Sequence, residues 1–187
     1  VPTPAPLPAP VTPVTPVPLA YKWDAQLELH GHNKSVLSLA LLPGGGLASG
    51  SNDGTVRLWD AARGGAATAV LEGHGGHMVA LAVLSDGRRL AAGVRSSMGG
   101  LMGAIVVWDT GIVPPTWCAT IDCVSGVWAL AVLSDGRLAV GGVDIHVWLM
   151  TVGAGVEAAR AKLTGHGSVV AALAVLPDGT LAGGAWD

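Results

Sequence analysis

The chain has 187 residues, of which 50% are hydrophobic and only 12% are charged, with 28 glycines and 12 prolines. This composition is too apolar for a disordered chain, and no run of about 18 apolar residues predicts a membrane-spanning helix. Ten basic against thirteen acidic residues give a net charge of −3 without a basic cluster, which excludes the usual electrostatic basis of nucleic-acid binding. The apolar residues are spread over many short segments, as in a protein of short β-strands.

The first 20 residues form a proline-rich segment. They include eight prolines, which remove backbone hydrogen-bond donors and hold φ near the polyproline value. Residues 1–20 are therefore predicted to be a disordered or polyproline-like extended linker, followed by one domain over residues 21–187. Pro10, Pro13 and Pro16 have a spacing that proline-motif readers bind, but no basic residue flanks them closely, so we interpret the segment as a spacer.

The remainder of the chain is built from a repeated sequence. The segment ALAVLSDGR occurs at residues 80–88 and again, unchanged, at residues 129–137, and the variant ALAVLPDGT occupies residues 172–180. The equivalent leucines are 42, 49 and 43 residues apart, and they are Leu39, Leu81, Leu130 and Leu173. A period of about 40–45 residues is typical of propeller blades and of helical repeats.

Local sequence decides between these two architectures. The segments TVRLW, IVVW and IHVW are short, β-branched and aromatic, and Asp-Gly turns separate such segments, as in β-hairpins. In the first unit we expect strands near Val36–Leu42, Leu47–Ser51, Thr55–Trp59 and Ala67–Leu71. We interpret residues 153–162, which have some helical character, as a loop leading into a fourth strand. The sequence thus predicts an all-β chain.

The first unit resembles a repeat of the WD-repeat β-propeller family. It carries Gly31-His32, a turn at residues 43–45 and LASGSNDGTVRLWD at residues 47–60. The resemblance covers the chain from about residue 26, with repeats at about 26–60, 67–109, 118–148 and an incomplete 160–187. It implies a partial β-propeller of about 3.5 four-stranded antiparallel blades. Because seven blades need about 300 residues, we expect the chain to be a fragment, the first half of a propeller.

The resemblance also implies a hydrogen-bond network. In the family an Asp–His–Ser–Trp chain joins neighbouring loops and satisfies buried polar groups. Only the first unit carries all four residues, as Asp53, His32, Ser49 and Trp59. Later units have Ala92, Val140 and Gly183 at the serine position and Cys123 at one histidine position. Asp187 aligns with Asp53, so the final Trp-Asp pair is not the signature dipeptide.

Three kinds of chemistry are disfavoured by the sequence. Ser49, His32 and Asp53 are the residue types of a hydrolase triad, but no nucleophile-elbow or oxyanion-hole sequence accompanies them. The histidines and cysteines at positions 74, 77, 118 and 123 lack the spacing of zinc ligands. The glycines form no phosphate-binding loop. We therefore expect a protein that is not an enzyme and that holds no metal or cofactor.

For function, the resemblance implies a non-catalytic scaffold that presents propeller loop faces to protein or peptide partners. Three alternatives stay open: the substrate-recognition part of a ubiquitin ligase, an accessory domain of a larger enzyme, or an inactive truncated repeat protein. Ligase receptors of the family often carry Trp-Asp-x-Arg after a strand, whereas Arg63 lies one place too far from Trp59-Asp60. Neither nucleic acid nor a membrane is an expected partner, and open blade edges favour self-association. Two cysteines are too few for a disulfide scaffold and favour an intracellular location, cytoplasmic or nuclear.

The longest insertion among the repeats, between residues 94 and 104, is the predicted contact surface. Long loops on rigid scaffolds often carry function, and methionine side chains suit an adaptable interface. We expect this loop to share a face with His77, and Trp128 near the start of an inner strand is a further candidate. The predicted partner contacts are His77, Arg95, Ser96, Ser97, Met98, Leu101, Met102 and Trp128.

Overall fold

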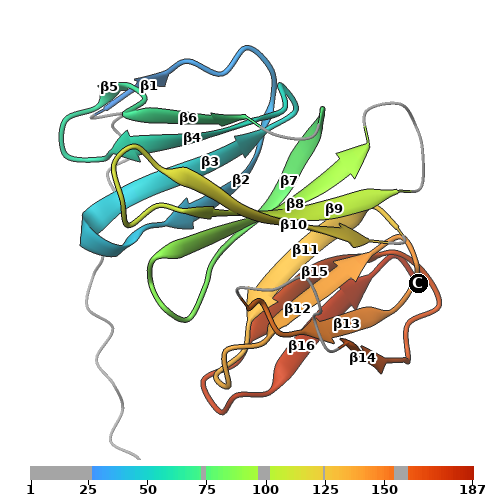
Figure 1. Ribbon diagram of the computed structural model, residues 1–187. Coiled ribbons are helices and arrows are strands. Elements are labelled where there is room, and N and C mark those ends of the chain that lie inside the picture. The colour runs from blue at the N-terminus through green and yellow to red at the C-terminus, as the bar shows by residue number, and fades with distance from the viewer. Residues whose placement is uncertain (1–26, 73–74, 97–101, 124, 154–159) are drawn as a thin grey trace, which may run out of the picture.

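The computed structural model of the chain describes residues 27–72, 75–96, 102–123, 125–153 and 160–187 (Figure 1). The proline-rich segment of residues 1–20 lies outside these described residues. In the described part, strands are joined by short turns, and no helix is long and apolar enough to cross a membrane.

The first sheet, called blade one, is a four-stranded antiparallel meander. Its strands are β2 (Val36–Leu41), β3 (Gly46–Ser51), β4 (Thr55–Asp60) and β6 (Ala69–Glu72), in that order across the sheet. A short 3-10 turn, η1 (Pro43–Gly45), joins the first two strands. Gly44 in this turn has φ +83°, a conformation that glycine adopts without steric cost. The four strands predicted for the first unit are confirmed, with the last one beginning two residues later than expected.

The second and third sheets repeat this arrangement. Blade two contains β7 (Gly76–Val83), β8 (Arg89–Ser96), β9 (Gly103–Asp109) and β10 (Thr116–Cys123). Blade three contains β11 (Val127–Val132), β12 (Leu138–Gly142), β13 (Val147–Met150) and β14 (Arg160–Leu163). The strand β14 begins inside residues 153–162, which we interpreted as a loop, so residues 160–162 are strand rather than loop; residues 154–159 lie outside the described residues.

The last sheet has two described strands, β15 (Val170–Val175) and β16 (Leu181–Ala185). Three four-stranded sheets and this two-stranded one confirm the predicted all-β partial propeller. Figure 1 shows the sheets arranged in chain order, from blade one in blue and teal to blade four in red. The first strands of neighbouring blades contact one another, β2 with β7, β7 with β11 and β11 with β15.

Two short strands, β1 (Leu29–His30) and β5 (Gly65–Ala66), do not belong to a blade sheet. Residues near 26–30 align with the strand that completes the last blade of a closed propeller. In the structure β1 instead pairs in parallel with β5, which lies in the connection between the last two strands of blade one. The register places Leu29 opposite Gly65 and His30 opposite Ala66.

The apolar core lies between the blades rather than within them. Strand alternation sends every second side chain to each face of a sheet. One face of blade one therefore contributes Ala48, Val56 and Leu58 to a cluster that also contains residues of blade two. Two further clusters join blade two to blade three and blade three to blade four. Each fully buried aliphatic side chain in these clusters contributes about 1.5–3 kcal/mol to stability.

Candidate interaction surface and its supporting network

The network residues of the first unit are joined by a continuous chain of hydrogen bonds. The turn between β3 and β4 carries Asp53, and the segment that enters blade one carries His32. Nδ1 of His32 lies 2.7 Å from Oδ2 of Asp53, and Nε2 of His32 lies 2.7 Å from Oγ of Ser49. The indole nitrogen of Trp59 donates to the same Oγ at 2.8 Å.

The order of donors and acceptors in this chain is set by its two ends. The Trp59 indole only donates and the Asp53 carboxylate only accepts. His32 therefore donates from Nδ1 to Asp53, and the Ser49 hydroxyl donates to Nε2. All four polar groups are satisfied, although the His32 and Asp53 side chains are 6% and 5% exposed. A buried chain without an unpaired group fixes the loop of His32 on the β3–β4 turn.

Asp53 accepts more hydrogen bonds than the histidine supplies. Burial by itself raises the pKa of Asp53, but hydrogen bonds from the Thr55 hydroxyl, His32 and the backbone amides of Thr55 and Asn33 outweigh it and hold the pKa well below its usual range. The Thr55 hydroxyl and amide lie 2.7 Å and 2.9 Å from Oδ1 of Asp53. The carboxylate thus stays charged and organises the turn.

Blade three replaces this network with a direct bond. Cys123 and Val140 occupy the histidine and serine positions, and neither supplies the chain seen in blade one. The turn between β12 and β13 is not shortened, since Gly141 lies opposite Val147 as Gly50 lies opposite Val56. Trp148 stands at the place of Arg57 in blade one, and its indole nitrogen donates to Oδ2 of Asp144. A pocket lined by Cys123, Val140 and Trp148, among others, lies where the missing side chains would be. The Asp–His–Ser–Trp chain is thus absent from these positions of blade three, and a single bond joins Asp144 to Trp148 instead.

In blade four, Asp187 holds the position that Asp53 holds in blade one, as the sequence alignment predicted. The backbone amide of Gly167 donates to Oδ2 of Asp187 at 2.7 Å, as the amide of Asn33 does to Asp53. A methyl group built on Gly183 would lie 2.9 Å from Nε2 of His166, where the serine of blade one bonds its histidine. The amide of Trp186 donates to the carbonyl of Val169 at 3.2 Å, as Asn52 does to Ser35 at 3.0 Å.

The predicted contact loop of the second unit is shorter in the structure than in the sequence prediction. The ladder between β8 and β9 continues outward, with Val94 opposite Ala104 and Arg95 opposite Gly103. Arg95 and Ser96 are therefore strand residues, because the extra residues lengthen the hairpin. His77 is likewise a strand residue, in β7, where it lies opposite Arg95. Ser97, Met98 and Leu101 lie outside the described residues, and Met102 is exposed.

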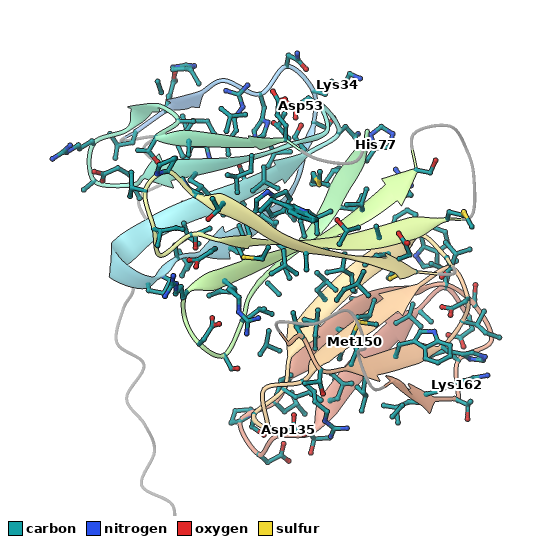
Figure 2. All side chains as sticks on the ribbon, viewed as in Figure 1. Lys34, Asp53, His77, Asp135, Met150 and Lys162 are labelled. Atoms are coloured by element: carbon teal, nitrogen blue, oxygen red, sulfur yellow. The ribbon has the colours of Figure 1, made fainter. Side chains whose placement is uncertain are left out.

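His77 is directed toward blade one. Nδ1 of His77 donates to the backbone carbonyl of Asn52 at 3.0 Å, which joins β7 to the β3–β4 turn of the neighbouring blade. Figure 2 shows Asp53 beside Lys34 on blade one, with His77 on the adjacent blade two. The contact couples the two blades at the edge where the network lies.

Trp128 is the centre of a cluster that spans three blades. The Arg95 guanidinium of blade two lies 4.6 Å from the centroid of the Trp128 ring on blade three. The Trp186 ring of blade four meets Trp128 edge-on, with centroids 5.2 Å apart and planes at 70°. A cation over an indole and an edge-to-face aromatic pair are both attractive. We call Arg95, Trp128 and Trp186 the Trp128 surface.

The two tryptophans of this surface differ in exposure. Trp186 is 62% exposed and Trp128 is half-buried, with an indole nitrogen that is buried and has no hydrogen-bond partner. Of the predicted contacts, Arg95 and Trp128 come together here, whereas His77 bonds to blade one. Sequence reasoning missed Trp186 because its position corresponds to a turn residue, Asn52, in the first unit. A tryptophan at a turn position normally occupied by a small polar residue was the available signal.

The described residues do not assemble a metal site. No group of three or more histidine, cysteine, aspartate or glutamate side chains in the described ranges lies close enough to hold an ion. Arg63, the residue one place out of the ligase-receptor pattern, is exposed, and its Nε lies 3.3 Å from Oδ2 of Asp60.

Comparisons with known proteins agree with the blade architecture. The family profile described as WD domain, G-beta repeat matches residues 23–60. A search of the curated proteins found no match. The chain is similar to a protein in the crystal structure of the mitotic checkpoint complex, with 24% identity and a TM-score of 0.73 over 84% of this chain and 48% of that one.

Two further solved structures are similar at 27% identity and a TM-score of 0.67. The RRP9 WD40 repeats match over 78% of this chain and 43% of that chain, and U3-55K matches over 78% and 44%. The chain thus spans less than half the length of these three structures. The match of residues 23–60 to a WD repeat, the repeated four-stranded blades and the similar solved structures together show that the described chain has the fold of a partial WD-repeat β-propeller.

Proposed function

We propose that the chain is a non-catalytic protein-interaction scaffold that binds a protein or peptide partner through the Trp128 surface. The observation that carries this proposal is the Arg95–Trp128–Trp186 cluster, in which three blades each contribute one large side chain. Tryptophan and arginine are the residues most enriched at the energetic centres of protein interfaces. The similar structures include a protein of the mitotic checkpoint complex and the RRP9 WD40 repeats, which supports protein partners as a class.

The surface is suited to a contact that needs little reordering. Arg95 is paired on both sides in β8, with His77 and Gly103, and Trp128 lies in β11 at a β-bulge between the paired residues Val127 and Ala129, so strand pairing holds the backbone at both positions before a partner arrives. Pre-ordered side chains lose less conformational entropy on binding than loop residues do. Met102, which is exposed and directly precedes the Gly103 that lies opposite Arg95 in the ladder, adds a flexible apolar side chain.

The proposed role excludes catalysis by the Asp53–His32–Ser49 chain. The distances resemble those of a hydrolase triad, but the Ser49 hydroxyl already accepts from the Trp59 indole and the residue is only 3% exposed. A nucleophile needs access to substrate and a nearby oxyanion hole. We expect wild-type protein and Ser49→Ala to hydrolyse an activated ester at the same rate. Ester hydrolysis that Ser49→Ala abolishes would contradict the non-enzymatic role.

The binding proposal is tested by affinity capture with matched variants. Arg95→Glu and Trp186→Ala each remove one side chain of the surface, while Trp117→Ala removes a similarly exposed tryptophan that lies on β10 outside it. We expect the same proteins to be recovered by wild type and Trp117→Ala and to be lost, at least tenfold, with both surface variants. Circular dichroism controls for folding. Equal recovery by all four chains would contradict the Trp128 surface as the binding site.

A further inference from the structure

Neighbouring blades are joined by a repeated contact between a side chain and a glycine. A methyl group built on Gly50 would lie 3.1 Å from Cβ of Met78, one on Gly93 would lie 2.5 Å from Cγ1 of Val127, and one on Gly141 would lie 2.7 Å from Cγ1 of Val170. Each glycine lies on the second strand of one blade, and each partner lies on the first strand of the next. Met78, Val127 and Val170 are accordingly 0%, 1% and 0% exposed.

The same two positions lack this contact at the ends of the series. Val36 occupies in β2 the place of Met78, Val127 and Val170, yet it is 49% exposed. Gly184 occupies in β16 the place of the three glycines, yet a methyl group built on it would meet only Cβ of Ala172, at 3.8 Å. Within the described residues, Val36 of blade one therefore has no glycine of another blade to pack against. Gly184 of blade four has no side chain of a following blade packed on it.

The surroundings of these two positions are complementary as well. On blade one, Leu39 and Leu41 are 62% and 79% exposed, whereas the equivalent Leu81 and Val83 of blade two pack against the core cluster shared with blade one. On blade four the exposed face carries Ala172, Ala174 and Ala182, and the last two are paired across the ladder. On blade one, the paired residues Ala40 and Ala48 are equivalent to Ala174 and Ala182. They belong to the core region between blades one and two, against which Leu81 and Val83 of blade two also pack.

We propose that the 187-residue chain binds a second copy of itself head to tail, with the β2 face of one copy on the β15–β16 face of the other. Val36 then inserts at Gly184, and Leu39 and Leu41 cover Ala174 and Ala182. The contact repeats the three interfaces already present within the chain. Because one chain spans 43–48% of the propellers it resembles, two chains with two such contacts amount to about one ring. This inference does not depend on the Trp128 surface.

Size-exclusion chromatography with light scattering tests the assembly on the full 187-residue chain. The expected mass is twice the 18.7 kDa of one chain. Two variants each block one face: Leu39→Glu with Leu41→Glu, and Ala174→Glu with Ala182→Glu. All four positions are exposed in the single chain, so these changes leave its fold intact, as circular dichroism will verify. Each variant alone should have the mass of one chain, and Val113→Glu, at a fully exposed loop position, should keep the mass of two.

Mixing the two variants separates head-to-tail from face-to-face association. One partner of the mixture retains its β2 face and the other retains its β15–β16 face, so one contact is restored and a heterodimer forms. An association through two like faces would instead survive in one of the variants alone and gain nothing from mixing. A wild-type mass of one chain, or a dimer that persists in either face variant, would overturn the proposal.

Discussion

The Asp53 carboxylate is expected to stabilise the fold because it accepts several hydrogen bonds from buried donors. Its carboxylate accepts from Asn33, from His32 and twice from Thr55, whereas Asp144 of blade three is bonded by the Trp148 indole. We expect Asp53→Ala to lower the free energy of unfolding by about 1–3 kcal/mol, because it leaves several buried donors unpaired. Asp144→Ala should cost less. Urea denaturation of both variants checks this, and equal losses would contradict the difference between the two turns.

The depressed pKa of Asp53 makes stability depend on pH. The folded state holds this carboxyl ionised below its ordinary pKa of 3.8, so the stabilisation is complete above that value and is lost as the pH falls further. We expect the free energy of unfolding of Asp53→Asn to fall less than that of wild type between about pH 5 and pH 2. Asp178→Asn is the control, since water screens its exposed carboxyl. Parallel profiles for wild type and Asp53→Asn would rule out this linkage.

Ile145 holds a backbone conformation that its side chain disfavours. Its φ is +60°, in the left-handed region, because Ile145 stands in the β12–β13 turn where blade one has Gly54, whose φ is +85°. This conformation costs an L-residue about 1–2 kcal/mol, whereas asparagine and glycine adopt it more readily. We expect Ile145→Asn to raise the melting temperature by a few degrees, about 1 kcal/mol. Ile112→Asn, at an exposed position of blade two, should not raise it. A lower melting temperature for Ile145→Asn would show that the turn is unstrained.

At the scale of the strands, the glycines of the second strand of each blade set the distance between blades. Gly93 of β8 has Val127 of β11 against it, at a separation that leaves no room for a methyl group. We expect Gly93→Ala to cost about 1–3 kcal/mol by overpacking this interface. Gly46→Ala is the matched control, because a methyl group there meets its nearest neighbours at 3.4–3.5 Å. Thermal denaturation compares the two, and an unchanged melting temperature for Gly93→Ala would contradict the close blade contact.

The extra residues of the second unit lengthen the β8–β9 hairpin instead of forming a longer loop. The extra residues of the second unit could have formed a loop, but the ladder instead continues through Arg95 opposite Gly103. Because the backbone groups of an extended hairpin pair with each other, part of the insertion becomes ordered at little cost. This extension places Arg95 over Trp128 and so joins blade two to blade three at the surface.

At the scale of the whole molecule, backbone protection should differ between the middle and the ends of the blade series. Strand β8 lies between β7 and β9, while β16 has one neighbouring strand among the described residues. We expect amide hydrogens of β8 to exchange slowest and those of β16 to exchange orders of magnitude faster. Head-to-tail packing on the face of β16 would leave its outer edge unpaired and would not reverse this order. Hydrogen exchange with mass spectrometry checks it, and equal rates would indicate that β16 has another partner strand.

The sequence by itself determined the elements and their repetition. Strand positions, the Asp-Gly turns and the completeness of the first network follow from residues within about 45 positions of one another, because a blade is a meander of neighbouring strands. The register that aligned Asp187 with Asp53 could also be counted directly along the chain. These features depend on local alternation and turn chemistry, which a single unit expresses without its neighbours.

Only the tertiary structure decided how the units meet. The cluster of Arg95, Trp128 and Trp186 joins residues from three blades, and the direct bond from Trp148 to Asp144 depends on the register of β12 with β13, which places Trp148 opposite Val140. Val36 and Gly184 stand at the positions that form the buried glycine contacts elsewhere. They are exposed because they lie in the first and the last described blade. Sequence pattern specifies which face of a strand is apolar, whereas the packing of blade on blade determines what covers that face.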